Sequence, residues 1–193
     1  MDTHIGIGYS QHLDTNTASQ EAVHRARMAL RSSTADLVLI FHTIHHNTTT
    51  IIHTAYSEFP DAKIIGCSSA GVILSDDILT HGIGVLAVSS DEIQFGVGST
   101  VGISPSNIRL AGSDLARNLI NDYGLASRSA CLFFIDGRIA DTSPMLKSSG
   151  CANASGLNHN SGPGSSGRKA TPGTEFTRRY GTIPPVLLNS GSS

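Results

Sequence analysis

The run at residues 36–41, DLVLIF, constrains the fold of this chain more than any other stretch. Its five consecutive apolar residues are typical of a strand that is buried on both faces, as in parallel sheets. A helical pattern rich in alanine precedes the run at residues 17–32, and a second helical stretch follows at residues 48–59. Another short apolar run comes next, at residues 62–66. This alternation of strand and helix predicts an α/β fold with parallel neighbours.

The remaining segments extend this pattern. Residues 5–9 form a short β-like start, residues 82–89 and 93–100 suggest two paired strands, and residues 130–135 suggest a last buried strand. Ser104-Pro105 opens a third helix, because proline is favoured at the first helical position. We therefore expect a mixed, mainly parallel sheet with flanking helices.

Composition excludes several classes of function. The 193 residues carry a net charge of −2 and 5% aromatic residues, which gives no electrostatic or stacking reason to expect a nucleic-acid partner. The N-terminus lacks the pattern of a signal peptide, and no apolar run approaches the roughly 18 residues of a membrane helix, so we expect no membrane insertion. Three cysteines without a CxxC pair indicate a reduced, cytoplasmic protein.

The character of the chain changes after Lys147. Residues 148–193 contain nine serines, eight glycines and four prolines among 46 residues, and only one acidic residue. Such a segment buries too little apolar surface to offset its chain entropy. We predict a domain over residues 1–147 and a disordered tail over residues 148–193.

Residues 66–71, GCSSAG, place small and polar residues where a strand is expected to end. Ligands of open α/β sheets bind beyond the carboxyl ends of the strands, and small residues let backbone N–H groups approach them. The alternative is a tight turn whose hydroxyls bond their own backbone. A nucleophilic role for Cys67 has less support, because the motif is not a GxSxG elbow and no base is apparent.

Four histidines crowd one region of the sequence. His42 ends the second predicted strand, His45 and His46 follow in a loop, and His53 lies in the next helix. Imidazoles in a loop could coordinate a metal or a haem iron. Metal or haem coordination lacks support from a paired helical spacing of histidines or from a nearby carboxylate. We therefore expect these histidines to be solvated loop residues.

The ordered series of motifs resembles the N-terminal part of the FIST domain. It comprises a GxGxS start with Gly6, Gly8 and Ser10, the alanine-rich helix, DLVLIF, FPDA at 59–62, IGCSSAG at 65–71 and FIDG at 134–137. The similarity covers about residues 4–147. Beyond that point family members continue with a helix and a glycine-rich strand, so the chain is expected to be truncated and its domain incomplete. A frameshifted product and a natural linker are both consistent with such a tail.

The resemblance implies a sensory role in signal transduction, with amino acids as proposed ligands. Our leading hypothesis is a non-enzymatic domain that binds a small polar ligand and acts through a separate signalling protein of kinase or chemotaxis type. Because some relatives bind haem, a haem-binding sensor of nitric oxide is one alternative; a hydrolase or transferase built on Cys67 is another. The expected ligand-binding residues are Ser10, His42, Gly66, Cys67, Ser68, Ser69, Ala70 and Gly71, with no catalytic or metal-binding residue.

Overall fold

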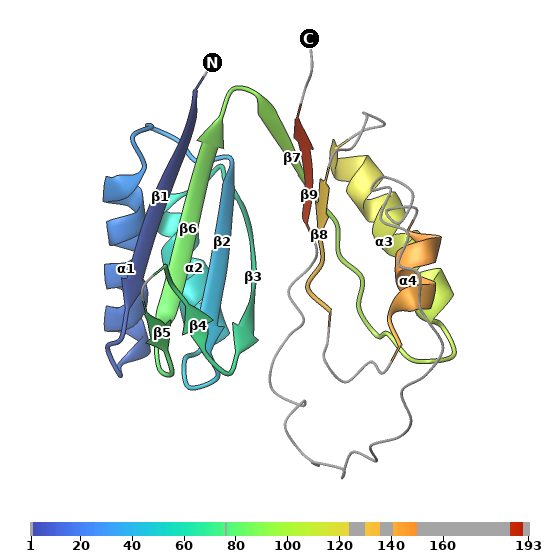
Figure 1. Ribbon diagram of the computed structural model, residues 1–193, viewed down its shortest axis with the longest axis horizontal. Coiled ribbons are helices and arrows are strands. Elements are labelled where there is room, and N and C mark those ends of the chain that lie inside the picture. Colours follow the sequence, from blue (N-terminus) through green and yellow to red (C-terminus); the bar gives the residue numbers. More distant parts are fainter. Residues whose placement is uncertain (1, 76, 124–129, 136–140, 150–185, 191–193) are drawn as a thin grey trace.

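A computed structural model gives the fold (Figure 1). It describes residues 2–75, 77–123, 130–135, 141–149 and 186–190. Its centre is a four-stranded sheet in the order β1-β6-β2-β3. These strands span Thr3–Ser10 (β1), Ile83–Ser90 (β6), Leu37–Thr43 (β2) and Lys63–Ser69 (β3). Helices α1 (Thr15–Ala29) and α2 (Thr48–Glu58) lie together on one side of this sheet.

The pairing confirms an α/β fold with a mixed sheet and flanking helices, but the expectation of mainly parallel pairing was wrong. β2 and β3 form one parallel pair, whereas β6 pairs antiparallel with both β1 and β2. The reason is that β6, which follows β3 in the sequence, inserts between β1 and β2. β1, β2 and β3 still run in the same direction, so their carboxyl ends meet at one edge of the sheet. We call this edge the carboxyl edge.

Helix α1 packs unusually close to β1. Ala18, Ala22 and Ala26 on its inner face are fully buried. A Cβ atom at Gly8 would lie only 2.1 Å from the carbonyl oxygen of Ala22, so glycine is required there. The helix starts earlier than its pattern predicts, since Asp14 is the N-cap and accepts a hydrogen bond from the backbone nitrogen of Thr17 at 2.9 Å.

A second layer covers part of the other sheet face. It contains β7 (Ile93–Val97), β8 (Ala130–Leu132) and β9 (Val186–Ser190) in the order β7-β9-β8, with α3 (Ile108–Tyr123) and α4 (Ser143–Ser148) beyond them (Figure 1). The sequence suggested that β7 pairs with the preceding strand, but its described partner is β9. Strand β9 belongs to the segment 148–193, for which we expect disorder. Apart from residues 148, 149 and 186–190, that segment lies outside the described residues. Residues 136–137 of the FIDG motif also lie outside them.

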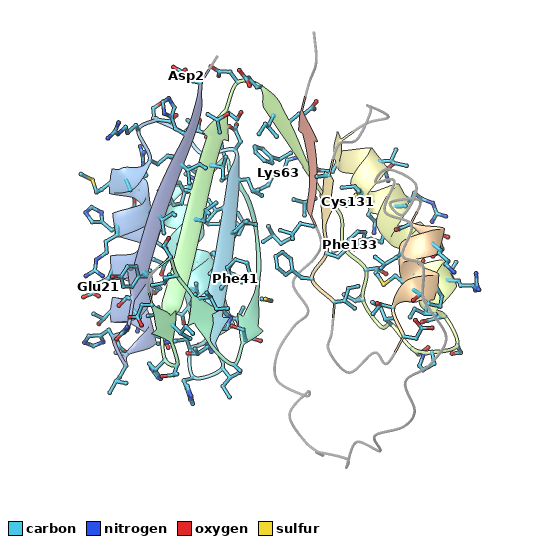
Figure 2. The ribbon with its side chains drawn as sticks, viewed as in Figure 1. Asp2, Glu21, Phe41, Lys63, Cys131 and Phe133 are labelled. Carbon is cyan, nitrogen blue, oxygen red and sulfur yellow. The ribbon has the colours of Figure 1, made fainter. Side chains whose placement is uncertain are left out.

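Apolar contacts join the two layers. Leu37, Ile65 and Val88 of the central sheet pack with Phe95 of β7. The ring of Phe41 meets that of Phe134 edge-to-face, with centroids 5.7 Å apart. The neighbouring Phe133 instead packs towards α3 and α4, and Figure 2 shows it between β8 and these helices. Alternating side chains after β8 therefore serve two different apolar clusters.

A short hairpin closes the lower end of the central sheet. It consists of β4 (Val72–Ile73) and β5 (Ile78–Leu79), which pair antiparallel directly after the GCSSAG motif. Val72 and Leu79 are buried, while Ile73 and Ile78 point to solvent. Among the helices that the structure describes, none has the length and apolar character needed to span a bilayer.

Candidate functional site

The register of the central sheet brings three predicted site residues into one row. Ser10 of β1 pairs with Ile83 of β6, Ile83 pairs with His42 of β2, and His42 pairs with Ser68 of β3. Directly paired residues point to the same face of a sheet. Ile83 belongs to the core cluster under α1 and α2, so this whole row faces those helices. We call Ser10, His42 and Ser68 the edge row.

Ser10 is bonded to a residue that the sequence did not single out. Its side chain is buried, and its Oγ donates a hydrogen bond to Oε2 of Glu21 on α1 at 2.7 Å. The same carboxylate lies 3.7 Å from the guanidinium of Arg25, and its side chain is 41% exposed. Figure 2 shows Glu21 on α1 at the outer side of the sheet. Glu21 thus brings an accessible negative charge to the edge row.

His42 is held by the protein through both ring nitrogens. Its Nδ1 lies 2.9 Å from the carbonyl oxygen of Thr43, which can only accept, so Nδ1 carries the hydrogen. Its Nε2 therefore accepts from the hydroxyl of Thr48, 3.1 Å away. Burial lowers the pKa of His42. The neutral ring fixes the loop between β2 and α2, and neither nitrogen is left to bind a ligand.

The GCSSAG motif lies further inside the sheet than its sequence suggests. The expectation that the strand stops at Gly66 was wrong, because β3 continues to Ser69 and pairs with β2 throughout. A Cβ atom at Gly66 would lie 1.7 Å from the carbonyl oxygen of Ile40, so the glycine is needed for strand pairing. The sheet register therefore explains the first glycine of the motif without a ligand.

The hydroxyls of the motif differ in their roles. Ser69 Oγ donates to the carbonyl oxygen of Gly71 at 2.7 Å, which is the local turn interaction predicted as the alternative to a binding role. Ala70 is exposed beside this turn. Ser68 is half-buried, and its hydroxyl has no hydrogen-bond partner within the described residues. Among the serines of the motif, Ser68 offers the hydroxyl best placed to meet a ligand.

Cys67 lies on the other face of the sheet. Its register partner is Phe41, and the side chains of both point away from the edge row towards the second layer. The thiol is half-buried, and burial raises its pKa. A raised pKa keeps the thiol protonated and poorly nucleophilic. The geometry does not bring Cys67 together with Ser10, His42 and Ser68.

A cluster of three histidine rings stands beside the edge row. The ring of His81 stacks on that of His45, with centroids 4.9 Å apart, and meets His46 edge-to-face at 4.7 Å. Contrary to the expectation of solvated loop histidines, His46 is only 1% exposed. The Nε2 atoms of His46 and His81 are both buried, and neither has a hydrogen-bond partner in the described part of the chain. The sequence pattern did not single out His81, because it lies just before β6 and far along the chain from His45 and His46.

The cluster disfavours positive charge on its own rings. The pKa of His46 is lowered to about 4, first by burial and then by His81, His42 and His45, with Asp14 acting weakly in the opposite direction. Within the part of the chain that the structure describes, no three His, Cys, Asp or Glu side chains are placed to share a metal ion. Both nitrogens of His42 are bonded within the protein, so this ring offers no nitrogen to a haem iron.

Two helix N-termini meet at the carboxyl edge. α1 begins at Thr15, soon after β1 ends, and α2 begins at Thr48, soon after β2 ends. Asp14 and Asn47 cap them, each accepting a hydrogen bond from the third helical residue. The first turn of a helix presents unpaired N–H groups and partial positive charge. The edge row therefore lies where polar or anionic groups are favoured.

Comparison with known proteins relates the chain to one family. Residues 36–162 match the family model described as the FIST N domain. This match begins later than the motifs at residues 4–10 and extends beyond Lys147, where the likeness was expected to stop. No curated protein matches the chain.

Comparison with solved structures includes one likeness that is weak. One match is a W319Y mutant of FtsZ from M. jannaschii, with 21% identity and a TM-score of 0.33. The match covers 46% of this chain and 27% of that structure. A likeness this weak carries no argument about fold or function.

Proposed function

Since the chain belongs to the FIST N-domain family, whose members are sensory domains in signal transduction, we propose that it binds a small polar molecule at the carboxyl edge. An amino acid is the ligand class that we favour. The observation that carries the proposal is the edge row, in which Ser10, His42 and Ser68 occupy one row of the sheet, with Ile83 between Ser10 and His42, at the edge where α1 and α2 begin.

The groups at this edge match the two ends of an amino acid. Glu21 provides a carboxylate that accepts hydrogen bonds from Ser10 and is accessible enough to meet an ammonium group. The hydroxyl of Ser68 and the helix N-termini suit a carboxylate or another acceptor. Ser10 and Ser68 lie three strand spacings apart, roughly 14 Å. An amino acid that meets both ends must therefore be a long one, with the cationic end of its side chain towards Glu21 and its carboxylate towards Ser68 and the N-terminus of α2.

Several features support binding rather than catalysis. The one thiol of the motif, Cys67, has a raised pKa and faces away from the edge row. His42, the most central base, has both nitrogens occupied by Thr43 and Thr48. We propose that the domain acts in the cytoplasm, where ligand binding orders the edge loops and is read by a separate signalling protein of kinase or chemotaxis type.

The test is a thermal melt of the full chain with each of the twenty amino acids, followed by calorimetric titration of any that raise the midpoint. A ligand that binds only the native state adds about 2.7 kcal/mol of stability at a hundredfold excess over its dissociation constant. Ser68→Ala should weaken binding about fivefold to tenfold by removing one hydrogen bond. Ser33→Ala is the matched control, because Ser33 is exposed and far from the edge.

The outcome distinguishes binding from its absence. A protein that melts cooperatively but shifts with no amino acid contradicts the proposed ligand class. Binding that Ser68→Ala leaves unchanged contradicts the proposed location. A haem titration in the same series addresses the alternative, since a Soret band that develops with a one-to-one endpoint would replace the amino-acid proposal.

A further inference from the structure

We propose that His46 and His81 form an anion subsite that holds the carboxylate, or an equivalent phosphate, of the ligand. This inference rests on the proposed function and adds to it a binding subsite that the sequence did not identify. It starts from two atoms, His46 Nε2 and His81 Nε2, which are buried and have no hydrogen-bond partner among the residues that the structure describes.

Unpaired buried nitrogens of this kind are rare and costly. More than about nine in ten buried polar groups in proteins are hydrogen-bonded. Each one left unsatisfied has lost its hydrogen bonds to water without gaining a protein partner in exchange. Here two such atoms belong to neighbouring rings, with the centroids of His46 and His81 only 4.7 Å apart. One ligand group that reaches both rings would satisfy both nitrogens.

The surroundings of His46 indicate which kind of group this is. Its Nδ1 lies 3.3 Å from the hydroxyl of Thr15, which also accepts a hydrogen bond from the backbone nitrogen of Asn47. When the hydroxyl donates its hydrogen to Nδ1, the hydrogen of the neutral ring resides on Nε2. Burial and the neighbouring histidines keep the ring neutral by lowering the pKa of His46 to about 4. The unmet group is then an N–H donor, whose complement is an oxygen acceptor.

The same contacts place the subsite between the two helix starts. Thr15 is the first residue of α1 and Asn47 caps α2, and both are linked to His46. Helix N-termini favour anions. The charged and titratable groups around His46 are His42, His45, His81 and Asp14, of which only Asp14 is acidic, and its carboxylate is bound by Thr17. An anion here would therefore be held by N–H donors and the two helix N-termini rather than by a formal positive charge.

The loop that carries His81 is tied to the edge row. Thr43 donates its backbone N–H to the carbonyl oxygen of Gly82 at 2.9 Å, and Gly82 donates to the hydroxyl of Thr43 at 3.1 Å. Gly82 has φ of 155°, and a Cβ there would lie 2.5 Å from the carbonyl oxygen of Ser10. An anion that joins His46 to His81 therefore links the loop after β2 to the loop before β6.

The test follows the imidazole nitrogens directly. We would label the full chain with ¹⁵N and titrate it with sodium phosphate and sodium acetate, against sodium chloride at equal ionic strength. The inference predicts saturable chemical-shift changes of the His46 and His81 ring nitrogens. The anion that binds with the lower dissociation constant shows whether the subsite prefers a phosphate or a carboxylate. His81→Ala should weaken the interaction at least tenfold. His24→Ala is the control, since His24 is exposed on α1.

The outcomes separate this inference from the proposed function. Amino-acid binding that survives His81→Ala, without any shift at His46, overturns the anion subsite and leaves the proposed function standing. Saturable shifts with phosphate alone support the subsite and assign it to a phosphate rather than to the carboxylate of an amino acid. No shift with any anion overturns the subsite. Zinc that binds through both Nε2 atoms more tightly than either anion also overturns it, and assigns the nitrogens to a metal.

Discussion

A methyl group at Gly8 is expected to force α1 away from β1. An ideal Cβ at this position lies 2.1 Å from the carbonyl oxygen of Ala22 and 2.4 Å from the backbone nitrogen of Ala26. Both obstacles are main-chain atoms of a helix, so no side chain can rotate out of the way. To restore contact distances of about 3.5 Å, the helix must move outward by roughly 1 Å or more.

The loss of stability depends on how much of the packing between α1 and β1 this movement disturbs. Overpacking a core costs about 1–3 kcal/mol. The interface includes Ala22, Val23 and Ala26, all of them fully buried. The strain therefore cannot be relieved by moving one residue, and the whole helix face must shift. We expect Gly8→Ala to lower the free energy of unfolding by about 3 kcal/mol, a large part of the 5–15 kcal/mol of a typical domain. At an unstrained glycine the same change would stabilise by about 0.4–1 kcal/mol, so even the sign is informative.

Urea unfolding monitored by circular dichroism measures this difference. Ile7→Ala is the control, because Ile7 lies next to Gly8 but is 53% exposed on the other face of β1. We expect the control to lose less than about 1 kcal/mol. If Gly8→Ala is as stable as the wild type, or loses no more than Ile7→Ala, the argument that glycine permits the close approach of α1 is refuted.

Three further predictions concern the site. The free energy of unfolding should fall by up to about 3 kcal/mol from pH 6.5 to pH 4, because His46 has its ordinary pKa in the unfolded chain and a pKa of about 4 in the folded protein. Urea unfolding at several pH values across this range measures the change. His46→Gln should remove most of this pH dependence. Cys67 should react with iodoacetamide at pH 7 more slowly than a free thiol, since its pKa is raised; labelling at the rate of free cysteine would contradict its burial. Glu21→Gln should weaken amino-acid binding about tenfold by calorimetry, whereas Glu58→Gln, at the far end of α2, should leave it unchanged.

Local patterns in the sequence were sufficient for most of the elements. The apolar run at residues 36–41 became β2, and the alanine repeat became the buried face of α1, because periodicity depends only on neighbouring residues. The direction of β1, β2 and β3 also followed, since helices connect them in turn. This is why the carboxyl edge could be located, and why Ser10, His42 and Ser68 do lie together there. Whether these residues bind a ligand stays a prediction.

Other features required contacts between distant segments. The insertion of β6 between β1 and β2 depends on strand pairing across the whole chain, and it turned a mainly parallel sheet into a mostly antiparallel one. The partner of β7 lies almost a hundred residues later, in β9. No local pattern encodes such pairings, because they are chosen by competition among all available strand edges.

The sequence by itself determined the α/β class, the helix and strand segments of the first half and the edge at which polar residues gather. The tertiary structure decided what those residues can do. It placed Cys67 on the opposite face from Ser68, occupied both nitrogens of His42, and brought His81 against His46. The physical reason is that side-chain direction alternates along a strand, while burial and hydrogen bonding depend on neighbours that only the folded chain supplies.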